Sequence, residues 1–121
     1  MALAGKRVLV VEDEGIVSMM IEEYLEELGC EVAGAAARLG EALAMARALE
    51  VEMAVLDVNL AGELSYPVAD VLRERGVPFL FATGYGVAGL PDALSGAPVL
   101  QKPFRREHLA KAMCRAAEAG G

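Results

Sequence analysis

Acidic, hydroxyl and ammonium side chains follow four short apolar segments of this sequence. Glu12 and Asp13 follow the first segment, and Asp57, Thr83 and Lys102 each follow a later one. Carboxylates suit Mg²⁺, which binds through one or two of them together with phosphate oxygens. An ammonium supplies a point charge for phosphate, and a hydroxyl can donate a hydrogen bond to it. These residue types would suit phosphoryl transfer to a carboxylate nucleophile beside a metal ion.

Asp57 is the candidate nucleophile, because it ends the apolar run at residues 53–56. In open α/β sheets, ligands bind just outside the carboxyl ends of the strands. The simpler interpretation is that Asp57 only caps a turn, where Asp is common, and that Lys102 is a solvated surface lysine. Polar groups follow four of the segments and are expected at one edge of the sheet. This favours a phosphoryl site over the interpretation that each group is there by chance.

Five apolar segments predict strands, and the stretches between and after them predict helices. The strands are expected at residues 6–11, 30–36, 53–58, 77–82 and 99–101. The helices are expected at residues 14–28, 39–49, 65–75, 87–94 and 109–117, and residues 61–65 are expected to form a loop. Ser65 should cap the third helix, and Gly29 and Gly76 should end the first and third. This alternation predicts a parallel sheet with right-handed crossovers and helices on both faces, so the polar side chains meet at one edge.

Composition restricts the class of protein. The 121 residues predict a single domain over residues 1–121, and 55% hydrophobic with 24% charged residues predicts a globular fold. A net charge of −7 argues against a nucleic-acid surface, and no apolar run is long enough for a membrane span. Cys30 and Cys114 match no metal spacing, so we expect buried free thiols in a reducing cytoplasm.

Four motifs taken together resemble the receiver domain of two-component response regulators. They are Val8-Leu9-Val10-Val11-Glu12-Asp13-Glu14, Val55-Leu56-Asp57, Ala82-Thr83-Gly84 and Gln101-Lys102-Pro103-Phe104. The resemblance extends over residues 6–119, and residues 78–85 are similar to the signature of the FAT GUY subfamily of mostly stand-alone receivers. It implies an α/β fold: a flavodoxin-like (βα)5 three-layer sandwich with strand order 2-1-3-4-5.

The resemblance also implies roles for the residues at the edge. Asp57 would accept a phosphoryl group from a histidine kinase or a histidine phosphotransfer protein. Asp13 and Asp57 would bind Mg²⁺ together with the backbone carbonyl of Asn59, and Glu12 would act mostly through a metal-bound water. Thr83 and Lys102 would bind the phosphoryl oxygens.

The sequence departs from the receiver pattern in two places. Receivers usually carry an aromatic residue where Val99 stands, and a proline and a glycine soon after the phosphoacceptor, where residues 59–65 stand here. We therefore expect a different switch, in which Thr83 moves toward the phosphoryl group, Tyr85 is repositioned and residues 86–96 become ordered. The resemblance further predicts a cis peptide bond between Lys102 and Pro103.

The function expected from the sequence is that of a single-domain response regulator in a phosphorelay. It would be a phosphoacceptor with autodephosphorylation rather than an enzyme, and would bind a protein partner or act as a phosphate shuttle or sink, as a monomer or weak dimer. One alternative is a receiver cut from a longer regulator that has an output domain. Another is a Mg²⁺-dependent aspartyl phosphohydrolase, although such enzymes want a second acid where Asn59 stands.

Overall fold

A five-stranded parallel sheet forms the centre of the protein. The computed structural model describes residues 3–84, 91, 94 and 96–120. The strands are β1 (Arg7–Val11), β2 (Glu31–Ala36), β3 (Met53–Asp57), β6 (Phe79–Thr83) and β7 (Val99–Gln101). They lie in the order β2-β1-β3-β6-β7, and every neighbouring pair is parallel. The predicted order 2-1-3-4-5 is therefore confirmed.

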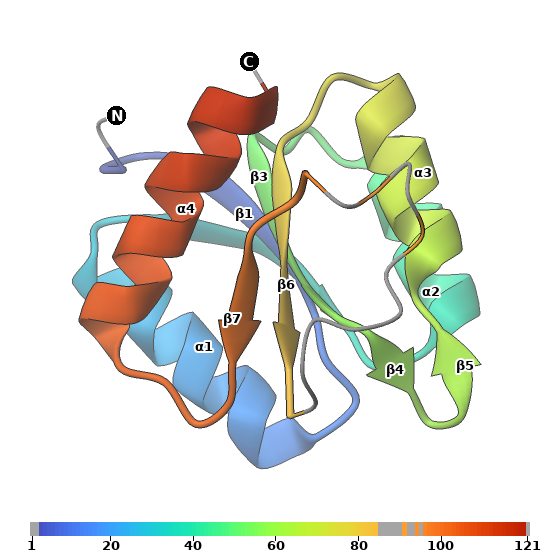
Figure 1. Ribbon diagram of the computed structural model, residues 1–121, viewed down its shortest axis with the longest axis horizontal. Coiled ribbons are helices and arrows are strands. Elements are labelled where there is room, and N and C mark those ends of the chain that lie inside the picture. The colour runs from blue at the N-terminus through green and yellow to red at the C-terminus, as the bar shows by residue number, and fades with distance from the viewer. Residues whose placement is uncertain (1–2, 85–90, 92–93, 95, 121) are drawn as a thin grey trace.

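Helices cover both faces of the sheet (Figure 1). Helices α1 (Gly15–Glu27) and α4 (Arg106–Gly120) lie on one side, and α2 (Leu39–Ala48) and α3 (Tyr66–Glu74) lie on the other. Successive residues of β1 alternate between two apolar clusters: Val8 and Val10 pack with α1 and α4, whereas Leu9 and Val11 pack with α2 and α3. A strand that is apolar on both faces in this way is typical of the interior of a parallel sheet.

Two glycines end helices as expected, but Ser65 does not act as predicted. Gly29 and Gly76 have φ angles of 83° and 72° just beyond α1 and α3, a conformation that costs glycine little. Ser65 precedes α3, yet its hydroxyl makes no capping hydrogen bond. The backbone of Ser65 has φ −83° and ψ 2°, whereas a capping side chain usually needs an extended backbone to reach the amides ahead of it.

The segment after Asp57 is not the simple loop that the sequence suggested. It contains a short antiparallel hairpin of β4 (Asn59–Leu60) and β5 (Glu63–Leu64). Ala61 and Gly62 form its turn with φ angles of 53° and 94°, and two positive φ angles are typical of a type I′ hairpin turn. Strands of two residues show too little alternation to be detected, and Ala is disfavoured in this conformation.

The structure corrects one further expectation and leaves others outside the described residues. Cys30 is buried, but Cys114 is only half-buried, so it is not the buried thiol that was predicted. Tyr85 and most of the residues in the predicted helix at 87–94 and in the proposed switch segment lie outside the residues that the structure describes. Within the described residues, no helix has the length and apolar character needed to cross a membrane.

Candidate functional site

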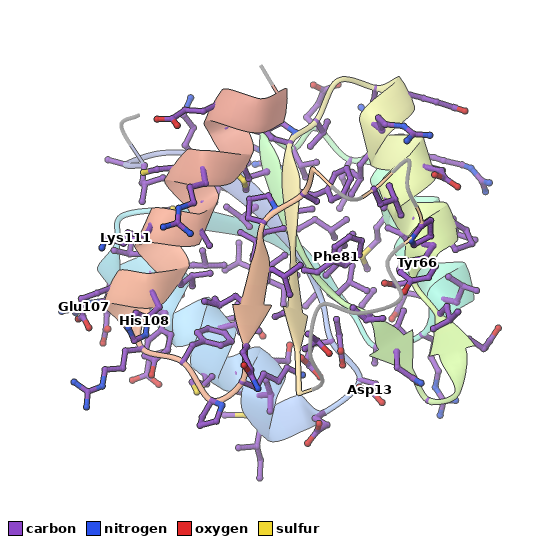
Figure 2. The ribbon with its side chains drawn as sticks, in the orientation of Figure 1. Asp13, Tyr66, Phe81, Glu107, His108 and Lys111 are labelled. Atoms are coloured by element: carbon purple, nitrogen blue, oxygen red, sulfur yellow. The ribbon has the colours of Figure 1, made fainter. Side chains whose placement is uncertain are left out.

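The three predicted carboxylates lie together at the carboxyl edge of the sheet. Glu12 and Asp13 follow β1, and Asp57 is the last residue of the neighbouring β3. One carboxylate oxygen from each residue lies within 4.8 Å of the others. Figure 2 shows Asp13 at this edge, near the ends of the strands. We refer to Glu12, Asp13 and Asp57 as the acidic cluster.

Lys102 brings a cation to the acidic cluster from the end of β7. Its Nζ lies 2.6 Å from Oε1 of Glu12 and 3.4 Å from Oδ2 of Asp57. Its backbone amide donates a hydrogen bond of 2.8 Å to the carbonyl oxygen of Thr83. The Lys102–Pro103 peptide bond is cis, which confirms that prediction. From the end of β7, Lys102 therefore contacts residues at the ends of β1, β3 and β6.

The β4–β5 hairpin also reaches the acidic cluster. The backbone amide of Ala61 donates a hydrogen bond of 3.1 Å to Oδ2 of Asp13. The amide of Gly62 donates one of 2.7 Å to Oδ1 of Asn59, so the side chain of Asn59 stabilises the turn. No sequence signal marked Ala61 as part of the site, because its contribution comes from a backbone N–H whose direction depends on the hairpin.

A cleft of about 390 Å³ opens onto these residues. Its lining comprises Asp13, Glu14, Asp57, Asn59, Gly84 and Lys102. Glu12 and Thr83 are buried, so they lie behind this surface rather than on it. Glu14 was not predicted to be a site residue, but it lines the cleft. A carboxylate next to Glu12 and Asp13 in the sequence was the available signal.

The environment shifts the pKa values of three groups in the site. Burial, together with the neighbouring carboxylate of Glu12, raises the pKa of Asp57 to about 7. Burial also acts to raise the pKa of Asp13, but hydrogen bonds from Asp57 and the amide of Ala61 outweigh it and lower that pKa. For Lys102, burial favours the neutral amine, yet Glu12 and Asp57 outweigh it and raise the pKa. The site thus holds a protonated lysine beside carboxylates that repel one another.

The residues present fit a hard divalent cation. Three carboxylates offer oxygen atoms within 4.8 Å of one another, which is the donor type that Mg²⁺ takes. Lys102 offsets part of their charge, yet burial and the carboxylate of Glu12 still raise the pKa of Asp57. A cation in the cleft would favour the ionised form of Asp57. The acidic cluster therefore has the chemistry of a magnesium site.

The raised pKa of Asp57 leads to a prediction about stability in metal-free solution. Its folded value of about 7 lies above the ordinary value of 3.8. The proton on Asp57 therefore stabilises the folded state fully below about pH 4, and this contribution is lost as the pH rises through 7. Asp57→Asn carries no such group, so its advantage over the parent should grow with pH. At pH 8 we expect the free energy of unfolding of Asp57→Asn to exceed that of the parent by about 1–2 kcal/mol. The full pKa shift would correspond to about 4 kcal/mol, and solvent in the open cleft reduces this difference.

Urea unfolding with a chelator at pH 4 and pH 8 measures this difference. Asp70→Asn, on the exposed side of α3, is the matched control for removing one negative charge from a chain of net charge −7. An equal gain for Asp57→Asn at both pH values would show that the proton on Asp57 does not contribute to stability.

Comparison with known proteins gives a consistent result over most of the chain. Residues 8–114 match the family described as response regulator receiver domain. Among curated proteins, the transcriptional regulatory protein PdtaR of Mycobacterium tuberculosis is 28% identical over 107 residues, which cover 85% of this chain and 52% of PdtaR. The chain therefore spans about half the length of this relative.

Solved structures are similar over almost the whole chain. SdrG from Sphingomonas melonis Fr1 is 39% identical with a TM-score of 0.83, over 96% of this chain and 98% of SdrG. The receiver domain of the sensor histidine kinase PA1611 from Pseudomonas aeruginosa PAO1 is 26% identical with a TM-score of 0.80, over 95% of this chain and 99% of that domain. In that crystal structure a magnesium ion is coordinated in the active site cleft.

Proposed function

The chain belongs to the response regulator receiver domain family, and on this basis we propose that Asp57 accepts a phosphoryl group from a phosphohistidine. The observation that supports this role most directly is the position of Asp57 at the end of β3, with two further carboxylates and the ammonium of Lys102 within reach. The protein would act in a two-component phosphorelay, as one receiver domain over residues 1–121, in the cytoplasm, where the thiols of Cys30 and Cys114 stay reduced.

The proposed transfer is a substitution at phosphorus. A carboxylate oxygen of Asp57 forms the new P–O bond as the P–N bond to the donor histidine breaks, and the histidine nitrogen keeps the electron pair of that bond. The reaction needs Asp57 in its ionised form, and a cation in the cleft would favour that form over the protonated one that burial favours in the metal-free site. Because little covalent chemistry is required of the protein, positioning and neutralisation of charge should set the rate.

Each remaining residue of the site has a role in this proposal. Asp13, Asp57 and the backbone carbonyl of Asn59 would hold Mg²⁺, with Glu12 acting mostly through a water, and the ion would neutralise charge on the phosphoryl oxygens. Lys102 would supply a second cation to those oxygens, and it already lies 3.4 Å from Asp57. Thr83 is buried at the end of β6, and its hydroxyl would donate a hydrogen bond to a phosphoryl oxygen.

Incubation with a small phosphodonor and Mg²⁺, followed by intact mass measurement, tests this function. We expect one phosphate adduct, formed only when Mg²⁺ is present. The alternative of an aspartyl phosphohydrolase predicts repeated turnover of small phosphate esters instead. Such turnover, or the absence of an adduct with any phosphodonor, would contradict the proposal.

The donor is proposed to be a histidine kinase or a histidine phosphotransfer protein, and α1 offers a surface for it. Ile16 and Met19 have exposed fractions of 86% and 69%, and both lie in the first turns of α1, just after Asp13. Large apolar side chains in contact with water beside a reactive site are typical of a docking surface. The phosphorylated protein would then bind a partner or pass the phosphoryl group on. In the alternative of a receiver that belongs to a longer regulator, the gene would also encode an output domain.

Replacing both apolar side chains of α1 should slow transfer from a protein donor only. We expect Ile16→Ser combined with Met19→Ser to lower the rate of phosphotransfer from a phosphorylated histidine phosphotransfer protein by roughly tenfold or more. Labelling by a small phosphodonor should stay unchanged, because the acidic cluster is intact. The matched control is Leu64→Ser on β5, which removes another exposed apolar side chain. Equal loss with both donors would place the effect in the chemistry rather than in docking.

A further inference from the structure

Two carboxylates of the acidic cluster each have one oxygen held by a nitrogen donor. The backbone amide of Ala61 donates a hydrogen bond of 3.1 Å to Oδ2 of Asp13. The ammonium of Lys102 lies 3.4 Å from Oδ2 of Asp57. A donor N–H beside a carboxylate oxygen repels a cation that would share that oxygen, because both carry positive charge. Oδ1 is therefore the oxygen of Asp13 and of Asp57 that is left to bind a cation.

Glu12 has donors at both of its oxygens. Its Oε1 lies 2.6 Å from Nζ of Lys102, and its Oε2 accepts a hydrogen bond of 3.2 Å from the backbone amide of Glu14. This agrees with the proposed role of Glu12 through a metal-bound water rather than as a direct ligand. The acidic cluster therefore offers a cation two single carboxylate oxygens, one from Asp13 and one from Asp57, although it contains three carboxyl groups.

Mg²⁺ and Ca²⁺ differ in how many carboxylate oxygens they need. Mg²⁺ keeps several waters and is bound through one or two carboxylates, whereas Ca²⁺ takes about six to eight oxygens and often both oxygens of one carboxylate. From these contacts we propose that the backbone amide of Ala61 determines the choice of metal, because it restricts Asp13 to one oxygen and so favours Mg²⁺ over Ca²⁺. This inference rests on the proposed function, since it concerns the metal of the phosphoryl site.

The turn of the β4–β5 hairpin directs the amide of Ala61 toward Asp13. Oδ1 of Asn59 accepts a hydrogen bond of 2.7 Å from the amide of Gly62 and so holds the turn closed. Ala61 has a φ of 53°, which is unfavourable for a residue other than glycine, and its charge-assisted hydrogen bond to a carboxylate offsets this cost. The chain departs from the receiver pattern in this segment, where a proline is usual, and a proline has no N–H to donate. Ala61 is thus a positioning residue that acts through Asp13.

Replacing the N–H of Ala61 by an ester oxygen tests this role. Lactic acid in place of Ala61 keeps the methyl group and removes only the donor, whereas Ala61→Pro would also forbid a φ of 53°. In titration calorimetry of the unphosphorylated protein with Mg²⁺ alone, the ester should lower the affinity by roughly tenfold, because Asp13 is no longer held. With Ca²⁺ alone the affinity should stay level or rise, since both oxygens of Asp13 become available. An unchanged ratio of the two affinities would overturn the proposal.

Two controls separate the missing donor from a damaged hairpin. Ala61→Gly keeps the N–H, and glycine adopts a positive φ at little cost, so the ratio of Mg²⁺ to Ca²⁺ affinity should equal that of the parent. The same ester placed at Leu64, an exposed residue of β5, leaves the amide of Ala61 intact and should also keep that ratio. If either control shifts the ratio as far as the ester at position 61 does, the effect belongs to the hairpin as a whole and the specific role of Ala61 is rejected.

Hydrogen exchange of the Ala61 amide, followed by NMR, tests whether its bond to Asp13 persists in the loaded site. In the parent, exchange should be as slow with saturating Mg²⁺ as without it, because Oδ2 of Asp13 stays with the amide. Faster exchange with Mg²⁺ would mean that the cation displaces the amide, and would overturn the proposal. An unchanged affinity ratio in the ester variant, with a phosphate adduct still formed on Asp57, rejects this inference alone, whereas a parent that binds neither cation rejects the proposed metal site as well.

Discussion

Asp57→Asn should abolish the phosphate adduct that forms with a small phosphodonor and Mg²⁺. The amide has no nucleophilic oxygen of comparable strength, and no other carboxylate lies at the end of β3. Loss should be complete within detection by intact mass. The fold should be retained, because asparagine has nearly the same shape and removes a carboxylate that burial penalises. This is the largest effect that we predict for a single substitution.

Glu14→Gln is the matched control for this result. Glu14 lines the same cleft but is exposed and follows a different strand from Asp57, so its loss should leave the adduct in place. Peptide mapping of the parent should locate the phosphate on Asp57. If Asp57→Asn is labelled as well as the parent, or if the phosphate maps to Glu12 or Asp13, then Asp57 is not the acceptor.

Asp13→Asn should remove most of the affinity for Mg²⁺. Asp13 contributes one of the three carboxylates that lie within 4.8 Å, and a neutral amide oxygen is a much weaker ligand for a hard cation than a carboxylate. The oxygen of the asparagine can still accept the hydrogen bond from Ala61, so the hairpin should keep its position. We expect affinity to fall by roughly tenfold or more, measured by titration calorimetry of the unphosphorylated protein.

The control for the metal is Asp70→Asn, which removes a carboxylate far from the site on the exposed face of α3 and should bind Mg²⁺ as the parent does. Formation of the adduct on Asp57 should fall together with Mg²⁺ affinity in Asp13→Asn, and should recover partly at high Mg²⁺. Equal affinity in Asp13→Asn and the parent would remove Asp13 from the set of metal ligands.

Most of the fold could be predicted, because the apolar segments are long and separated by clear breaks. The runs at residues 8–11 and 53–56 are uninterrupted, and a strand buried on both faces requires such a run. The prediction failed where the determinants are short or depend on backbone angles. The β4–β5 hairpin has strands of two residues and places Ala61 at a φ of 53°. The hydroxyl of Ser65 fails to cap α3 because its backbone is not extended there.

The amino-acid sequence alone was sufficient to predict which side chains lie at the carboxyl edge of the sheet. In a parallel sheet every strand points the same way, so polar residues that follow strands must meet, and this placed Glu12, Asp13, Asp57, Thr83 and Lys102 together. Residue types and order were sufficient for that conclusion. The strand order, in contrast, was predicted only from the family resemblance, because alternating strands and helices are compatible with more than one doubly wound order.

The interactions between these groups could not be predicted, because they depend on how the strands are placed in the folded protein. The distance of 2.6 Å between Lys102 and Glu12 depends on how β7 and β1 are placed across the sheet. The pKa of about 7 for Asp57 depends on burial and on Glu12, which comes from another strand. The contact from Ala61 to Asp13 is made by a backbone amide whose direction depends on the β4–β5 hairpin. These properties arise from contacts between residues that are distant in the chain, and a linear sequence does not contain those distances.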